Sequence, residues 1–251
     1  MNPPLWLGSH WLAPHYTEWL IKGALLTVWL ALLVCAAATL LGILCTALQA
    51  SRWSLVRWLT DFLLSLHRNT PLIVQLLLWY FGFSGQLPDT VMQWLNTPHF
   101  FSLPFGLQMA WPSLEILIAF VALTLYSASF IAGELRAGIR GVEPGQFFAA
   151  LALGMTRWQA FCSVVLPQAL VIVRRPLIGQ YAAVIKNTSL TMAIGVAELS
   201  YVSRQVETET LLAFQAFAIA TALYLLMVLS IQYTRKNKKK AASGVQYSCL
   251  R

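Results

Sequence analysis

The chain has 251 residues, of which 58% are hydrophobic and only 10% carry a charged side chain, against about 25% in an average soluble protein. This composition excludes an ordinary soluble enzyme or binding domain and indicates a single-domain membrane protein. The formal net charge of +8 does not indicate a nucleic-acid partner, because the basic residues stand beside apolar runs.

Five apolar runs are long enough to cross a bilayer, which takes about 20 helical residues. The predicted fold class is therefore an all-α membrane protein with five transmembrane helices. We expect these helices near 21–48, 56–83, 113–133, 177–197 and 211–233. Residues 1–20 form an N-terminal outer segment and 234–251 a basic tail, and a long inner loop spans about 134–176. The first 20 residues hold no Lys or Arg, so we do not expect a signal peptide.

Positive charge predicts the orientation of the spans. Lys and Arg gather in the first loop, the long middle loop and the tail, whereas the opposite regions hold only Lys22 and Arg204. Several acids accompany these two: Glu18, Asp89, Glu198, Glu207 and Glu209. The sequence thus predicts the N-terminus outside and the C-terminus in the cytoplasm. The basic tail is typical of a segment that stops transfer beside anionic lipid.

The second span contains a cation and a proline near its middle. Arg68 precedes Pro71 by three residues, with Asn69 and Thr70 between them. Proline removes a helix hydrogen bond and kinks the chain, which frees backbone groups. A kinked helix that carries these side chains and Gln75 at one depth could line a polar pathway. The alternative is that Arg68 reaches an interface because the span is tilted.

The fourth span contains Lys186, which predicts a helix interrupted between 177–185 and 190–197. Three side chains that can hydrogen-bond follow it: Asn187, Thr188 and Ser189. Discontinuous helices of this kind occur at the midplane of transporters. A charge at the bilayer centre costs about 2.5–3.5 kcal/mol on insertion scales, so it needs a cavity or a partner. Lys186 could face a substrate carboxylate, or it could pair with Glu134 or Asp61.

The middle loop contains a polar-flanked segment that predicts two short helices. Pro144 suits the first turn of a helix, and Gly154 can take the left-handed conformation that ends one. Thr156 and Gln159 have the spacing of a capping box for a second helix. We expect that helix to end before Pro167, since proline biases the preceding Leu166 toward extended geometry.

The first of these helices has a small, smooth surface at Ala149 and Ala150 beside two apolar side chains, Phe147 and Phe148. Such a surface allows close approach by another protein. A hairpin lying on the bilayer has the same features. Physical chemistry alone does not distinguish a surface that binds another protein from a hairpin that lies on lipid.

The same segment resembles the conserved cytoplasmic loop of ABC importer permeases, EAA-x3-G-x9-I-x-L-P. Here it reads Phe148-Ala149-Ala150, three residues, Gly154, nine residues, Val164, one residue, Leu166-Pro167. Phe148 replaces the usual Glu and Val164 the usual Ile. Two further stretches are similar to the polar amino-acid branch of that family: residues 67–75, running on to 79–81, and residues 186–190, running on to 194–198. The resemblance covers roughly residues 20–235.

This resemblance implies a MetI-like bundle with a cytoplasmic coupling helix, in a bacterial inner membrane. It implies an ATPase subunit dimer that holds the coupling segment, a second permease subunit, and a periplasmic binding protein that delivers the solute. The coupling residues would be Phe147, Phe148, Ala149, Ala150, Gly154, Leu166 and Pro167. The implied substrate is a polar amino acid, with glutamate or aspartate favoured and glutamine, basic or broad-range amino acids as alternatives.

Motifs of other functional classes are missing from the sequence. The chain has no G-x-x-x-x-G-K-[ST] phosphate loop, no G-x-S-x-G elbow, no H-E-x-x-H helix and no Cys/His metal spacing. We therefore expect no enzyme and no cofactor in this chain. An ATP-independent secondary transporter or channel remains the rival, and Asp61 is its only candidate for an ion-coupling acid.

Overall fold

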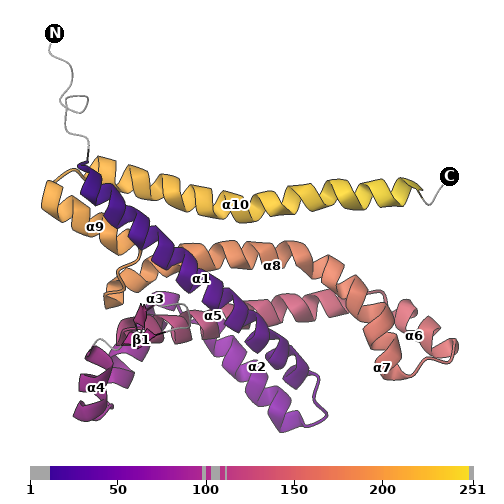
Figure 1. The fold of residues 1–251 in the computed structure, drawn as a ribbon. Coiled ribbons are helices and arrows are strands. Elements are labelled where there is room, and N and C mark those ends of the chain that lie inside the picture. Colours follow the sequence, from indigo (N-terminus) through magenta and orange to yellow (C-terminus); the bar gives the residue numbers. More distant parts are fainter. Residues whose placement is uncertain (1–11, 98–99, 103–107, 111, 249–251) are drawn as a thin grey trace.

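The computed structural model describes residues 12–97, 100–102, 108–110 and 112–248, and these ranges are almost entirely helical (Figure 1). In a bilayer, helices satisfy every backbone hydrogen bond internally, which explains why apolar runs fold this way. The α-helices are α1 (Pro14–Gln49), α2 (Ser54–Asn69), α3 (Leu72–Leu77), α4 (Asp89–Asn96), α5 (Leu114–Arg140), α6 (Pro144–Ala152), α7 (Arg157–Ala160), α8 (Leu166–Thr188), α9 (Leu199–Thr210) and α10 (Ala213–Ser248).

Three shorter segments have other helical geometries, and one small hairpin is extended. The π-helices are η1 (Leu78–Phe83) and η2 (Phe161–Val165), and η3 (Ser189–Ile194) is a 3₁₀-helix. Strand β1 (Phe100–Ser102) pairs antiparallel with β2 (Gln108–Ala110). Apart from this hairpin in the predicted outer loop, the described residues confirm the helical class.

Four helical stretches are long and apolar enough to cross a membrane: Pro14–Gln49, Leu114–Arg140, Arg157–Ile194 and Ala213–Tyr233. The predicted second span corresponds to a broken helix, in which α2 is followed by the short apolar stretch Leu72–Phe83. That the chain crosses the membrane five times remains a prediction, and so does the direction of each crossing. The features predicted for residues 1–11 lie outside the described residues.

Helices α1, α5 and α8 pack closely because glycine lies at their crossings. A Cβ atom on Gly42 of α1 would stand 2.8 Å from Ile131 of α5, and one on Gly138 of α5 would stand 2.0 Å from Val173 of α8. Small residues let two helix backbones approach each other closely. In a membrane this matters because helices associate through van der Waals packing and not through the hydrophobic effect. The largest buried cluster lies between these helices and α3.

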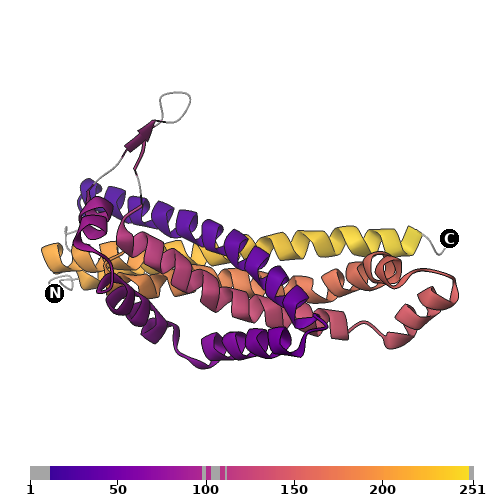
Figure 2. The same cartoon turned by 90° about the horizontal axis from the view of Figure 1, so that it is seen from below.

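The described chain begins and ends at opposite ends of the long axis of the molecule, since α1 starts near one end and α10 finishes near the other (Figures 1 and 2). Helices α6 and α7 lie toward the same end as the C-terminal part of α10, which we call the inner end; the start of α1 and α9 mark the outer end. This arrangement agrees with the predicted grouping of the basic loop and tail on one side.

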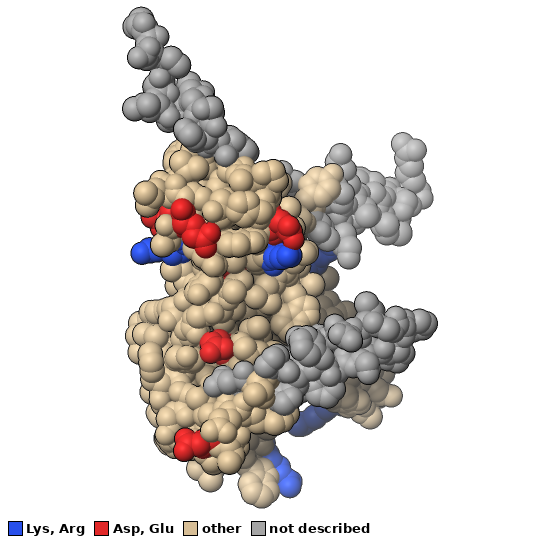
Figure 3. Space-filling model, turned by 60° about the vertical axis from the view of Figure 1, so that its left-hand side comes forward, with Lys and Arg blue, Asp and Glu red and all other residues tan. Residues whose placement is uncertain are grey.

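Charged side chains at the outer end pair with one another. Figure 3 shows acidic and basic side chains side by side over the outer parts of α1 and α9. The Lys22 ammonium lies 2.6 Å from the Glu18 carboxylate, and the Arg204 guanidinium lies 3.7 Å from Glu207. The first pair is exposed and the second is partly exposed, so both contribute little stability.

Candidate functional site

The segment from Pro144 to Ala160 folds as the two predicted short helices with a sharp bend. Helix α6 begins at Pro144 and ends at Ala152, and the bend follows at Gly154, whose φ is +85°. The Gly154 N–H donates to the Leu151 carbonyl over 3.0 Å, and the Met155 N–H donates to Ala150 over 3.2 Å. These bonds pair carbonyls that the end of α6 would otherwise leave free.

The start of α7 is fixed by the predicted capping box. The Gln159 N–H donates to the Thr156 hydroxyl over 3.3 Å, and the Thr156 N–H donates to Gln159 Oε1 over 2.9 Å. The two caps on either side of Gly154 give the bend a defined direction, because the backbone hydrogen-bonding groups at each helix end find partners within the segment itself.

The bent segment exposes apolar side chains at the inner end of the molecule. Phe148, Leu153 and Trp158 are 66%, 82% and 72% exposed. Ala149 beside them is also exposed, whereas Ala150 is buried. Three large exposed apolar side chains on one short bent segment suit contact with another protein or with lipid.

Phe147 differs from Phe148 in its environment. Phe147 is half-buried against the cluster of Val142, Val165 and Ala169. It also lines a cavity of about 410 Å³ between the end of α5, the start of α6 and η2. Of the two phenylalanines predicted as an anchor, only Phe148 faces away from the protein; Phe147 attaches α6 to the bundle.

The helix expected to end before Pro167 continues through it, so that prediction is wrong. Helix α7 leads through η2 into α8, with Leu166 and Pro167 in its first turn, and runs to Thr188. The widened π-turn of η2 shifts the carbonyls ahead of Pro167, which avoids the clash that a proline ring makes in a regular α-helix. The bent segment is therefore joined rigidly to a membrane-spanning helix.

The second span breaks at Pro71 as predicted. Helix α2 ends at Asn69, and Pro71 precedes α3 with extended backbone angles. The Gln75 side-chain amide donates to the carbonyls of His67 and Thr70, over 2.9 and 3.0 Å. Gln75 thereby pairs backbone groups that the break leaves without helix partners, and its own Oε1 is buried with no hydrogen-bond partner.

Arg68 lies in the last turn of α2 and reaches over α5. Its Nη1 is 3.2 Å from the place a Cβ would occupy on Gly133, and its Nε donates to the Leu64 carbonyl over 3.3 Å. The side chain is exposed, and no ion pair to it occurs within the described ranges. The neighbours Asn69 and Thr70 hydrogen-bond within α2, to Ser65 and Leu66.

Lys186 stands in the last turn of a continuous α8, so the predicted interruption at this residue is wrong. The α-helix changes to the 3₁₀ turn η3 after Thr188 and ends at Gly195, whose φ is +89°. Lys186 is exposed and Asn187 half-buried, whereas Thr188 is fully buried and donates to the Ile185 carbonyl. Helix η3 packs against α3, which brings this region beside the Gln75 region.

The ion pair considered for Lys186 does not form in the described part of the chain. Asp61 instead accepts from Arg136 over 2.9 Å and from the Gln49 amide over 2.5 Å. Glu134 makes no ion pair among the described residues. Lys186 is thus exposed and has no acidic partner among the described residues.

Glu198 ends one of the two stretches that are similar to the polar amino-acid branch, but nothing in the sequence assigned it a role beyond that of one of several outer acids. The structure buries it fully, at the N-cap of α9. Its Oε2 accepts from the Tyr224 hydroxyl over 2.5 Å and its Oε1 from the Tyr201 N–H over 2.9 Å. The Thr27 hydroxyl lies 3.5 Å from Oε2.

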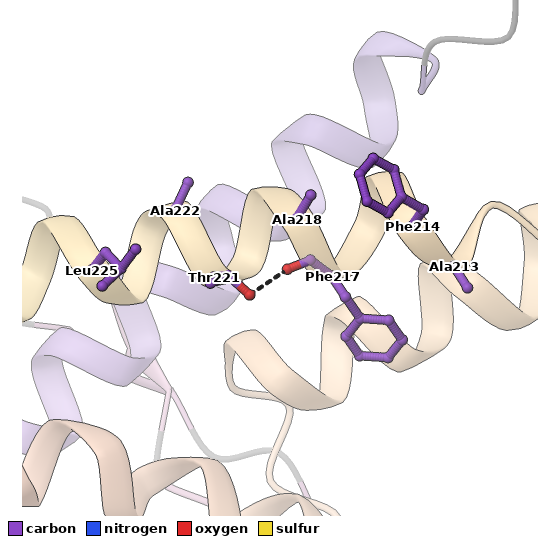
Figure 4. Close-up of a pocket in the computed structure, with 7 residues that line it drawn as sticks. All are labelled: Ala213, Phe214, Phe217, Ala218, Thr221, Ala222 and Leu225. Carbon is purple, nitrogen blue, oxygen red and sulfur yellow. Dashed lines mark hydrogen bonds between the residues drawn. The ribbon is translucent and has the colours of Figure 1, made fainter. Parts of the chain in front are cut away.

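One face of α10 is open and almost wholly apolar (Figure 4). Its only hydroxyl, on Thr221, donates to the Phe217 carbonyl of the same helix over 2.7 Å. This face suits lipid tails or another apolar helix. It is lined by Ala213, Phe214, Phe217, Ala218, Thr221, Ala222 and Leu225.

Residues 38–237 match the family described as "Binding-protein-dependent transport system inner membrane component". The chain is 28% identical to the probable glutamine ABC transporter permease protein GlnM of Bacillus subtilis, over 86% of this chain and 91% of the relative. It is 26% identical to the glutamate/aspartate import permease protein GltJ of Escherichia coli K12, over 84% and 82%.

A solved amino acid ABC transporter, crystallised with histidines, has a similar fold. The match has a TM-score of 0.74 at 27% sequence identity and covers 90% of this chain and 95% of that one. Since the family match covers well over half of the residues, and the predicted motifs lie within it, the chain belongs to the family of binding-protein-dependent transport system inner membrane components.

Proposed function

We propose that this chain is the membrane-spanning permease subunit of an ATP-binding-cassette importer for polar amino acids. The observation that carries the proposal is the bent segment α6–α7 at the inner end. It exposes three large apolar side chains and continues through η2 directly into α8. A membrane bundle has no need of such a projection for its own stability.

In this proposal an ATPase subunit dimer binds α6 and α7 of two permease subunits. ATP binding brings the ATPase subunits together and moves the bent segments with them. Because η2 and α8 form one helical stretch with α7, the displacement reaches the residues around Lys186. The membrane-lying alternative would show the same caps on both sides of Gly154; the direct continuation of α7 through η2 into α8 is what favours a segment that transmits movement.

The proposed solute pathway is lined by Arg68, Asn69, Thr70 and Gln75 from the broken second span and by Lys186, Asn187 and Thr188 from α8. A cation that remains on an open face within a span needs water, solute or a partner subunit to offset its desolvation. Arg68 and Lys186 are both exposed and have no ion pair within the described ranges. A polar pathway between two permease subunits provides those surroundings.

The proposed substrate is an amino acid, and we favour glutamate or aspartate. Two unpaired cations suit an anionic solute, although every amino acid carries an α-carboxylate. Relatives named for glutamine and for glutamate/aspartate are similar to this chain to nearly the same degree. The partners are then a periplasmic binding protein and a second permease subunit, in a bacterial inner membrane; no cofactor is proposed for this chain.

An ATP-independent transporter would need a free acid within its pathway for ion coupling. Asp61, the acid considered for that role, is engaged by Arg136 and Gln49 near the inner end. The importer is therefore the better-supported function.

Reconstitution in proteoliposomes tests the proposal. The chain is co-purified with the ATPase, and any second permease subunit, encoded beside it, and the co-encoded binding protein is added with a labelled amino acid. We expect uptake that requires ATP and the loaded binding protein. Uptake driven by an ion gradient without ATP would overturn the proposal, and competition among amino acids would identify the substrate.

A further inference from the structure

Glu198 is a carboxylate buried at a point where three helices meet. It belongs to the N-terminus of α9, Thr27 reaches it from α1, and Tyr224 reaches it from α10. The Leu199 N–H donates to the Thr27 hydroxyl over 3.2 Å, which joins α9 to α1 at this point. Just outward along α1, Gly23 leaves room for the Leu199 backbone: a Cβ there would stand 3.1 Å from the Leu199 Cα.

Stability alone does not account for this arrangement. A buried carboxylate loses several kcal/mol of hydration, and apolar side chains of similar volume are often at least as stable in such places. Capping α9 does not require Glu either, because Asp and Ser are better N-cap residues and their shorter side chains suffice for the N–H groups of the first turn. The additional length of Glu serves to reach Tyr224.

Tyr224 connects Glu198 to the proposed pathway. Its hydroxyl donates to Glu198, so the Ser200 hydroxyl at 3.0 Å donates to Tyr224 in turn. The Tyr224 ring also packs against the buried cluster that includes Val184 and Ile185 of α8. Ile185 directly precedes Lys186 near the end of that helix. Glu198 and Tyr224 thus join α9 and α10 to the end of α8.

We propose that Glu198 is a positioning residue for transport, which acts through Tyr224 to hold the last turn of α8, and with it Lys186, in place relative to α1 and α10. The inference rests on the proposed function, since it assigns a role within that transport cycle. It predicts that the length of the side chain at position 198 matters more than its charge.

Two single variants isolate the contact. Glu198→Asp keeps the carboxylate and the cap of α9 but is one methylene too short to reach Tyr224. Tyr224→Phe removes only the phenol oxygen. Glu198→Gln is the matched control, because its amide keeps the length, accepts from Tyr201 and donates to Tyr224. Each variant and the double variant are reconstituted in equal amounts with the ATPase and the binding protein.

We expect both single variants to lower the maximal uptake rate about tenfold, the effect of losing one hydrogen bond to a charged group. The concentration of loaded binding protein that gives half the maximal rate should not change. The double variant should be no slower than either single variant, because both remove the same contact. Glu198→Gln should retain most of the wild-type rate.

A wild-type uptake rate for Glu198→Asp would show that Glu198 serves only as a helix cap and would overturn the inference. Additive losses of rate in the double variant would overturn it as well. If Tyr224→Phe fails to insert, the comparison of Glu198→Asp with Glu198→Gln decides alone, and equal rates for these two would contradict the inference. An inactive wild-type assembly would instead overturn the proposed function, and the inference with it.

Discussion

Phe147 and Phe148 are neighbours in sequence with different surroundings. Phe147 packs against Val142 and Val165, whereas Phe148 is 66% exposed. At the position of Phe148 the family motif has Glu. The apolar ring removes any ion pair at that point, so this subunit presents a more apolar surface for its proposed ATPase than the motif leads one to expect.

This difference gives a paired prediction. Phe148→Ala should leave the melting temperature of the purified subunit unchanged but lower ATP-driven uptake, because it removes an exposed contact. Phe147→Ala should instead destabilise the subunit by about 1–3 kcal/mol, less than for a fully buried ring. Thermal unfolding in detergent and uptake in proteoliposomes measure the two effects. Equal uptake by Phe148→Ala and wild type would argue against α6 as the coupling surface.

At the scale of elements, the bend between α6 and α7 was predictable and its continuation was not. The Gly154 turn and the Thr156 cap are local: each depends on residues within one turn, so the sequence contains the whole signal. The helix can pass through Pro167 because η2 is a widened π-helix. No residue type in the sequence predicts a π-helix at that place. The burial of Glu198 depends on α1 and α10, which are distant in sequence, so its place at the end of a family-like stretch did not predict its partners.

The bend at Gly154 can be tested without changing any contact. A Cβ on Gly154 meets nothing within 4 Å, so a substitution there acts through the backbone alone. At a φ of +85° we expect Gly154→Val to cost roughly 1–3 kcal/mol in the bent conformation and to abolish most ATP-driven uptake. Asn accepts left-handed angles, so Gly154→Asn should retain uptake. Similar activity of both variants would show that the bend is not required.

The crossing of α5 and α8 makes a second element-scale prediction. A methyl group on Gly138 would stand 2.0 Å from Val173, whereas one on Gly179 would meet nothing within 4 Å. Gly138→Ala should therefore destabilise the bundle by about 1–3 kcal/mol through overpacking. Gly179→Ala, in the same pair of helices, should be neutral or slightly stabilising. The measurement is the melting temperature of each purified variant, and an unchanged value for Gly138→Ala would contradict the tight crossing.

At the scale of the whole molecule, charge is distributed in three ways. Outer charges pair on the surface, as in Glu18 with Lys22, and the inner end pairs Asp61 with Arg136. Arg68 and Lys186, between these ends, have no ion pair within the described ranges. Several arginines of the inner loops have no ion pair there either, so Arg68 and Lys186 are distinguished by their position between the two ends, where a cation needs water, solute or a partner subunit.

Lys186→Met tests that distribution, with Lys22→Met as the control of equal charge change at the outer end. Methionine has a similar length and shape without the charge, so α8 and its packing should persist. A hydrogen bond to a charged group contributes about 1.5–3 kcal/mol, so losing it at the solute should lower uptake tenfold or more. Lys22→Met should remain near wild type, because its exposed pair with Glu18 contributes little. If Lys186→Met inserted normally and transported at the full rate, the ammonium would have no part in the pathway, and the open face of α8 would be a packing surface for the second permease subunit.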